Sequence, residues 1–554
     1  MLPKTVRFFV IIPIILGGLF IQTSCDMQPR EETDIPVFSQ NYERFVRILS
    51  SDEFEGRAPT TPGGKKTKAY IEAEFRRMGL KPANGKSFRQ AVPLIEIVGS
   101  NFSDLQIGDS LVDLSFSYLD DMVVTTTRQE DSIRLTDNEL IFAGYGIVAP
   151  EYDWNDYEGL DVTGKTVVVF VNDPGYELED TELFTGKAMT YYGRWTYKYE
   201  EAARQGAAGV LIVHETGPAG YGWDVVRNSW SGPQYEVGGI NAGPSVMVQG
   251  WLHTDAAALL FDRAAYSLTQ LKELALSRDF TPFSLNMNVS VSFDVKHSRS
   301  DSYNIAGYVE GSERPEETVI YMAHWDHLGK EETDEGVKIY NGAIDNATGT
   351  AAIMAIAEKF AAMDPPPARS VVFIAVTAEE SGLIGSSYYA RNPLFPLEKT
   401  AGGINIDGLN VYGPTHDITV VGYSFSTLQN YLERHAAEQD RVLIPEKYPE
   451  RGYFYRSDHF NLVKEGVPMI YANSGDDYTG KNESYTNWVI EDRQARYHST
   501  EDVIHDRWNW KGLHQNLWLF YNVGEDLANT SDWPEWSEDN EFEAIRKVTD
   551  HLRK

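Results

Sequence analysis

The chain has 554 residues, 42% of them hydrophobic and 12% aromatic, and its 82 acidic against 49 basic residues give a formal net charge of −33. This length and apolar content suffice for several domains with buried cores and exclude an intrinsically disordered protein. The negative charge offers no basic surface to a phosphate backbone, so we exclude nucleic acid as a partner.

Residues 1–25 have the layout of an export signal. Lys4 and Arg7 precede the apolar run "FFVIIPIILGGLFI", which is too short to span a bilayer comfortably, and small and polar residues lead on to Cys25. Cys25 is the only cysteine, so no internal disulfide can form. The segment resembles a bacterial lipoprotein signal peptide; the alternative is an ordinary cleaved signal. We expect an exported protein, in the periplasm or at the outer membrane, that contacts a membrane only through an acyl anchor at Cys25.

Residues 26–135 and 265–530 are predicted to form one discontinuous domain. Two helical segments open it, and from Tyr303 onward apolar runs alternate with helical segments. Such alternation implies crossover connections and predicts an α/β fold, with a mainly parallel, mixed sheet flanked by helices.

Residues 136–264 have a different pattern of predicted elements. Short strand-like runs such as "KTVVVFV" precede a helical segment and a further strand, with their own small core pattern. We interpret this stretch as an inserted β-rich domain. The acidic tail, residues 531–554, suggests no chemistry.

Side chains of the metal-binding type follow the predicted parallel strands. His324 follows the run "TVIYMA", Glu379 and Glu380 come shortly after "SVVFIAV", and Asp407 follows "AGGINI". Asp345 stands directly before a predicted helix. In open α/β sheets functional groups gather at the carboxyl ends of the strands, so these side chains are expected to lie together. Histidine with carboxylates and no available thiol favours zinc or a similar divalent ion.

Two ions need a bridging carboxylate and further ligands on each side, and His498 in "RYHSTED" is a candidate fifth ligand. Asp326 is expected to orient the imidazole of His324. His327 is expected to contact a ligand or line the pocket rather than bind metal. Asp502 is expected either to orient His498 or to be a solvated acid.

The motifs "MAHWDHLG", "GAIDNATG", "TAEESG", "NID" and "YHSTED" occur in this order. They resemble those of the co-catalytic di-zinc exopeptidases of metallopeptidase family twenty-eight, over roughly residues 40 to 525. The resemblance implies two Zn²⁺ ions and Glu379 as general base, and it implies these metal ligands: His324, the bridging Asp345, Glu380, Asp407 and His498. "FAGYGIVAPEYDWNDYEGLDVTGKTVVVFVNDPG" resembles a protease-associated domain inserted in many members.

Three further residues are implied less directly. Tyr497 resembles a tyrosine of the carboxypeptidase branch whose hydroxyl steadies the tetrahedral intermediate; alternatively it packs against the sheet edge. Ser457 and Asp458 lie in a segment that resembles a border of the substrate pocket. Asp458 equally well caps a helix beginning at His459.

The leading functional hypothesis is an aminopeptidase that removes N-terminal residues from peptides. A carboxypeptidase acting on acidic peptide tails, of the glutamate carboxypeptidase type, is an alternative that needs a cationic side chain such as Arg451 or Arg456 in the pocket. A glutaminyl cyclase with one zinc and a catalytically silent binding scaffold are further alternatives.

Overall fold

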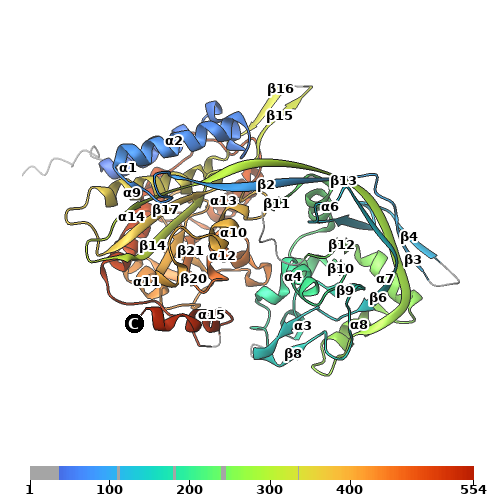
Figure 1. Cartoon of the computed structure of the whole chain (residues 1–554). Coiled ribbons are helices and arrows are strands. Elements are labelled where there is room, and N and C mark those ends of the chain that lie inside the picture. The colour runs from blue at the N-terminus through green and yellow to red at the C-terminus, as the bar shows by residue number, and fades with distance from the viewer. Residues whose placement is uncertain are drawn as a thin grey trace, which may run out of the picture.

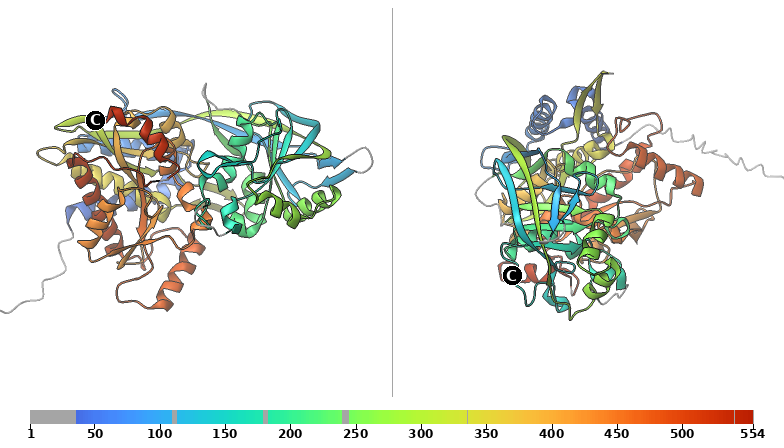
Figure 2. Two further views of the ribbon diagram at one scale, coloured as in Figure 1. Left: turned by 90° about the horizontal axis from the view of Figure 1, so that it is seen from below. Right: turned by 90° about the vertical axis from the view of Figure 1, so that its right-hand side faces the viewer.

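The computed structural model describes residues 36–108, 113–178, 183–238, 245–334, 336–538 and 540–553. The predicted signal peptide and Cys25 lie outside this part of the chain. Within it, no helix combines the length and the apolar character that crossing a membrane requires. The chain forms two lobes that lie side by side, bridged by the long strand β13 (Phe283–Val309) and its partner β2 (Arg89–Ser100) (Figures 1 and 2).

The first lobe is built on a mixed sheet. Its strands follow one another in the order β13, β17 (Arg369–Val376), β14 (Arg314–His324), β18 (Thr400–Asn405), β21 (Met469–Ser474), β19 (Asp417–Val421) and β20 (Val442–Pro445). The four strands from β17 to β21 run parallel, whereas β13 and β19 are antiparallel to their neighbours β17 and β21. The structure therefore confirms the predicted α/β fold, and the apolar runs "TVIYMA", "SVVFIAV", "AGGINI" and "VPMIYA" all form strands of this sheet.

Both faces of this sheet are buried, which explains the uninterrupted apolar runs. Successive side chains of a strand point to opposite faces. Tyr321 accordingly packs into one hydrophobic cluster and Met322 into another. The first cluster is covered by α1 (Val37–Leu49), α2 (Pro62–Met78), α9 (Gly349–Ala361) and α14 (Trp510–Asn529). The second is covered by α10 (Ile384–Arg391) and α12 (His459–Val463).

Helix α2 shows how local sequence sets an element. Thr61 precedes it and accepts a hydrogen bond from the Gly64 amide at 3.3 Å, while Pro62 occupies the first helical position. Gly79 ends it with φ of 84°, a left-handed conformation that glycine adopts without steric cost. The remaining elements of this lobe are β1 (Lys81–Pro82), the hairpin β15 (Gly329–Thr333) and β16 (Gly336–Tyr340), α11 (Gln429–Ala437), α13 (Glu483–Arg496) and α15 (Glu543–Val548).

The strands of the second lobe continue the sheet of the first through β2 and β13, apart from one separate pair, and the lobe has two hydrophobic clusters of its own. Its strands are β3 (Leu105–Gly108), β4 (Asp113–Phe116), β5 (Met122–Thr125), β6 (Ser132–Phe142), β7 (Val148–Ala149), β8 (Trp154–Asn155), β9 (Thr166–Phe170), β10 (Gly209–Val213), β11 (Gln234–Val237) and β12 (Val248–Leu252). Strands β7 and β8 form the separate pair. Its helices are α3 (Pro174–Leu178), α4 (Trp195–Arg204), α5 (Thr216–Ala219), α6 (Trp223–Ser231), α7 (Thr254–Arg263) and α8 (Leu268–Ala275).

The core of the second lobe also uses residues on either side of the stretch 136–264. Ile95 and Val295 both belong to its larger cluster, because β2 and β13 run from one lobe into the other. The bounds of the inserted domain and its protease-associated character stay predictions. Tyr191 of this lobe lies 5.0 Å, ring centre to ring centre, from Phe460 of the first, so aromatic packing joins the two lobes.

Candidate metal centre

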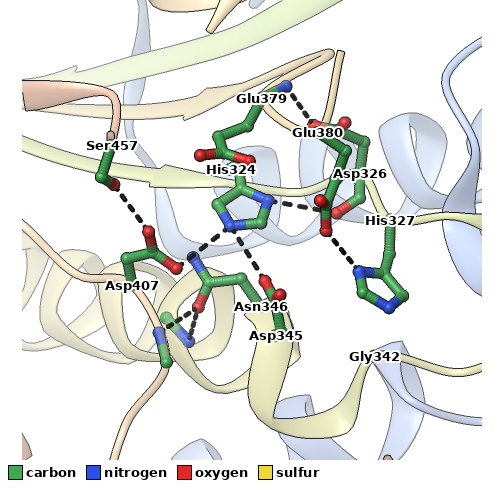
Figure 3. Close-up of polar contacts among 12 residues, drawn as sticks. His324, Asp326, His327, Gly342, Asp345, Asn346, Glu379, Glu380, Asp407 and Ser457 are labelled. Carbon is green, nitrogen blue, oxygen red and sulfur yellow. Dashed lines mark hydrogen bonds and ion pairs between the residues drawn. The ribbon is translucent and has the colours of Figure 1, made fainter. Parts of the chain in front are cut away.

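Parallel strands deliver most of the predicted ligands to one edge of the sheet (Figure 3). His324 is the last residue of β14, Glu379 and Glu380 follow β17, and Asp407 follows β18. Asp345 lies in the turn before α9, beneath the same edge.

Asp345 stands between two histidines. The His324 Nε2 atom lies 3.3 Å from Asp345 Oδ1 and 3.2 Å from Asp407 Oδ1. On the other side, the His498 Nε2 atom lies 3.3 Å from Asp345 Oδ2 and 3.0 Å from Glu380 Oε2. The two oxygens of one carboxylate therefore face two separate sets of nitrogen and oxygen atoms. The structure brings together all five residues predicted as ligands.

These side chains fit a pair of divalent cations. The ligand atoms of His324, Glu379 and Asp407 lie within 4.8 Å of one another, and so do those of His324, Asp345 and Glu380. Carboxylates this close repel one another unless positive charge lies between them. Burial lowers the pKa of His498, but hydrogen bonds to Asp345 and Glu380 outweigh it and raise that pKa to about 10. The site holds an excess of negative charge, and its nitrogen and oxygen donors are those that Zn²⁺ accepts.

Glu379 and Glu380 have opposite environments although they are neighbours. Burial raises the pKa of Glu379 well above its ordinary value, His324 opposes the shift, and the charges of Glu380 and Asp407 add to it. Burial also acts on Glu380, but hydrogen bonds from His327 and His498 bring its pKa below the ordinary value. Glu380 is thus held as an anion, whereas Glu379 readily holds a proton.

Asp326 makes a different contact from the one expected. Its main-chain oxygen, not its carboxylate, lies 3.2 Å from His324 Nδ1. The carboxylate instead accepts a hydrogen bond from the Glu379 amide at 3.2 Å, and burial raises its pKa to about 7. The turn that follows β14 places the Asp326 peptide group against the imidazole, so the backbone orients His324.

Ser457 and Asp458 also support the site rather than project into open space. The Ser457 hydroxyl donates to Asp407 Oδ2 at 2.6 Å and accepts from Asn405 Nδ2 at 2.8 Å. Asp458 is fully buried and accepts a hydrogen bond from the Ser386 hydroxyl at 2.6 Å. The alternative that Asp458 caps the following helix is wrong, because its side chain makes no cap hydrogen bond to α12.

Tyr497 stacks on His498, with ring centroids 3.9 Å apart and an interplanar angle of 19°. Its side chain is 66% exposed, so the alternative that it packs against the sheet edge is wrong. Desolvation, followed by the charges of Asp345 and Glu380, raises the pKa of its hydroxyl.

His327 contacts a ligand as expected, whereas Asp502 and Arg57 play parts that the sequence did not assign. His327 Nδ1 lies 2.6 Å from Glu380 Oε1, so His327 contacts a predicted ligand. Asp502 does not orient His498; its carboxylate accepts hydrogen bonds from the main chain at Asp345. Arg57 donates to the main chain beside His324. The motif spacing indicated that His327 lies near the site, but no local pattern links Arg57 to Trp325, its partner 268 positions away.

Strand ends supply His324, Glu380 and Asp407, the turn before α9 supplies Asp345, and His498 follows α13 (Glu483–Arg496). Histidines and carboxylates gathered in this way can bind divalent cations in a hydrolase. Residues 304–523 match the family model described as Peptidase family M28. This match confirms the resemblance found in the sequence motifs.

Individual relatives match shorter parts. The chain is 27% identical to aminopeptidase NAALADL1 of Rattus norvegicus over 42% of this chain and 36% of the relative. It is 30% identical to leupeptin-inactivating enzyme 1 of Streptomyces exfoliatus over 29% of this chain and 36% of that enzyme. The chain thus spans about a third of the length of these curated relatives. A solved structure, an aminopeptidase from Aneurinibacillus sp. strain AM-1, aligns with a TM-score of 0.48 and 17% identity, covering 88% of this chain and 93% of that one.

Proposed function

We propose that the protein is a zinc-dependent aminopeptidase that acts on peptides. The observation that carries this proposal is the placement of Asp345, whose two carboxylate oxygens each lie 3.3 Å from a different histidine. The names of two relatives, an aminopeptidase and a leupeptin-inactivating enzyme, support hydrolysis of peptide substrates.

His324 and Asp407 would hold one ion, His498 and Glu380 the other, and Asp345 would be shared. When bound, such a pair of ions polarises a peptide carbonyl and makes water acidic enough to act as a nucleophile near neutral pH. Glu379 is the residue that moves the proton: its carboxylate accepts it and returns it to the leaving amine. The raised pKa of Glu379 suits it to hold that proton between the two events.

Recognition of a free N-terminus follows from the charge of the site. Seven carboxylates lie in it or in contact with its residues: Asp326, Asp345, Glu379, Glu380, Asp407, Asp458 and Asp502. Acidic side chains outnumber cationic ones here, so the surroundings favour an α-ammonium group over a carboxylate.

One observation favours the carboxypeptidase alternative. Arg456 directly precedes Ser457, and its Nε and Nη2 atoms are buried without a hydrogen-bond partner among the described residues. A guanidinium so placed would suit a substrate carboxylate. Glu446, whose pKa this arginine lowers against the effect of burial, is the acid that competes for it.

Matched peptides with free, N-acetylated and C-amidated ends distinguish the two activities. An aminopeptidase cleaves the C-amidated peptide but not the N-acetylated one. A carboxypeptidase cleaves the N-acetylated peptide but not the C-amidated one. Bound zinc is measured on the same preparation by elemental analysis. Undiminished cleavage of the N-acetylated peptide would rule out the aminopeptidase.

We further propose export and acylation at Cys25, supported by the charged, apolar and small-residue order of residues 1–25. The resemblance to a lipoprotein signal carries this proposal. Incorporation of a labelled fatty acid into the wild-type protein, absent from Cys25→Ala, tests it. Equal labelling of both proteins would contradict it.

A further inference from the structure

Two buried side chains of opposite charge hold the loop that carries Asp345. This loop, residues 341–345, connects the β15–β16 hairpin to the turn before α9. We propose that Arg57 and Asp502 form a positioning pair that fixes the Asp345 carboxylate between the two halves of the metal centre. The inference rests on the proposed two-metal site, and neither residue is placed among its ligands.

Arg57 holds the carbonyl side of the loop. Its Nη1 atom donates to Asn341 O at 2.5 Å and its Nη2 atom to Gly342 O at 2.8 Å. Its Nε atom donates to Trp325 O at 2.9 Å, between His324 and Asp326. One planar group therefore fixes the main chain next to two predicted ligands, which a flexible ammonium cannot do in the same way.

Asp502 holds the amide side. Its carboxylate accepts from the Ile344 amide at 2.9 Å and from the Asp345 amide at 3.1 Å, and its main-chain oxygen accepts from the Ala343 amide at 3.0 Å. Asp502 lies four positions after His498, so one short segment supplies a predicted ligand and also fixes the bridging residue.

The charge of Arg57 matches this role. The side chain is 1% exposed, and its four side-chain hydrogen bonds all go to main-chain oxygens: Leu49, Asn341, Gly342 and Trp325. Burying a cation without a contacting carboxylate is costly. Burial lowers its pKa to about 10, and Asp502, followed by Asp345, opposes that shift. Arg57 therefore supplies positive charge beneath a cluster of acids while it fixes the backbone there.

Hydrogen bonds of the Asn341 side chain further restrict the loop that carries Asp345. Asn341 adds a side-chain hydrogen bond to Ser50 O at 2.9 Å and another to Asp52 Oδ1 at 2.8 Å. The loop is thus tied through both main chain and side chain to the segment that follows α1. Loss of Arg57 would let Asp345 rotate, and a ligand shared by two ions tolerates such rotation less than a terminal ligand does.

Three variants of the full chain test the pair: Arg57→Met, Arg57→Lys and Asp502→Asn. Arg369→Met is the control, because Arg369 is also buried and donates to the main-chain oxygens of Leu527 and Asp532, besides its ion pair with Glu317. Arg369 stands at the amino end of β17, away from the carboxyl ends that the predicted ligands follow. Zinc affinity is measured for each ion by chelator competition, and the metal-free fold is checked by circular dichroism and thermal unfolding.

We expect Arg57→Met and Asp502→Asn to weaken zinc binding about 10- to 100-fold, the range for groups that orient metal ligands. Arg57→Lys should restore part of the zinc affinity. Arg369→Met should lower the melting temperature and leave the zinc affinity as in the wild type. The Co²⁺-substituted Arg57→Met protein should show an altered visible spectrum. Wild-type zinc affinity and an unaltered spectrum in folded Arg57→Met or Arg57→Lys would overturn the inference. Failure of the wild-type protein to bind zinc would instead overturn the proposed function.

Discussion

Adjacent residues divide the chemistry of the proposed site. Glu379 and Glu380 leave the same strand end, yet hydrogen bonds from two histidines lower the pKa of the second, whereas burial raises that of the first. The two residues lie in the turn that follows β17, not in an extended strand, and their side chains meet different neighbours. One position is therefore suited to proton transfer and the other to holding a cation.

Glu379→Gln should keep both zinc ions and lose about 10²- to 10⁴-fold in kcat, because an amide cannot accept the proton. Glu380→Gln should lose zinc. Elemental analysis and steady-state kinetics on the same preparations check both. Full activity in Glu379→Gln would contradict the role of this residue as base.

At the scale of single residues, the sequence predicted the metal ligands better than the residues that orient them. His324, Asp345 and Asp407 stand next to recognisable strand and helix boundaries, so their convergence followed from a parallel sheet. Asp326 was expected to act through its carboxylate but acts on His324 through its carbonyl. Arg57 acts on main-chain atoms far away in sequence, and such contacts leave no pattern in side-chain types.

At the scale of elements, the second lobe reaches the loop of Glu379. Ile384, at the start of α10, is 3% exposed and packs in one cluster with Leu94 and Ala378. Tyr235 of β11 lies against the same cluster. The turn that carries both glutamates therefore stands on apolar contacts from β2, β11 and α10.

Ile384→Ala should destabilise the protein by about 2 to 5 kcal/mol, the usual range for a buried isoleucine. It should also lower kcat and weaken zinc binding, since the turn that loses support carries both Glu379 and the predicted ligand Glu380. Ile418→Ala in β19, at 1% exposure, is the control that should destabilise comparably with kcat retained. Equal kcat values in folded Ile384→Ala and Ile418→Ala would contradict the proposal that Ile384 supports the turn of Glu379.

The lengths of elements were harder to predict than their existence. The four apolar runs became strands because both faces of the sheet are buried. Strand β13, with 27 residues, crosses from one lobe to the other, and its partners lie in both. Its sequence alternates like that of an ordinary half-buried strand, so nothing local indicated that it continues past a lobe boundary.

Across the whole molecule, several acids outside the metal centre titrate near neutral pH. Burial raises the pKa of Glu236 to about 7, that of Glu446 to about 7 and that of Glu541 to about 8. Their unfolded values lie near 4.3, so the folded protein binds more protons between these limits. The contribution of these three acids to the free energy of unfolding should therefore fall as the pH rises from about 5 through 8.

Urea unfolding at pH 6, 7, 8 and 9 measures this trend. Glu541→Gln, which keeps an acceptor for the Tyr455 hydroxyl 3.2 Å away, should flatten the upper part of the pH dependence. Glu483→Gln, at an exposed position on α13, should leave it as in wild type. A pH dependence in Glu541→Gln identical to that of the wild type would contradict the assignment.

The central claim is that Asp345 is shared by two divalent ions. Anomalous diffraction at the zinc absorption edge, from crystals of the purified protein, tests it most directly. The account predicts two peaks about 3.5 to 4 Å apart, one on the side of His324 and Asp407 and one on the side of His498 and Glu380. A single peak, or none at the Asp345 carboxylate, would contradict it.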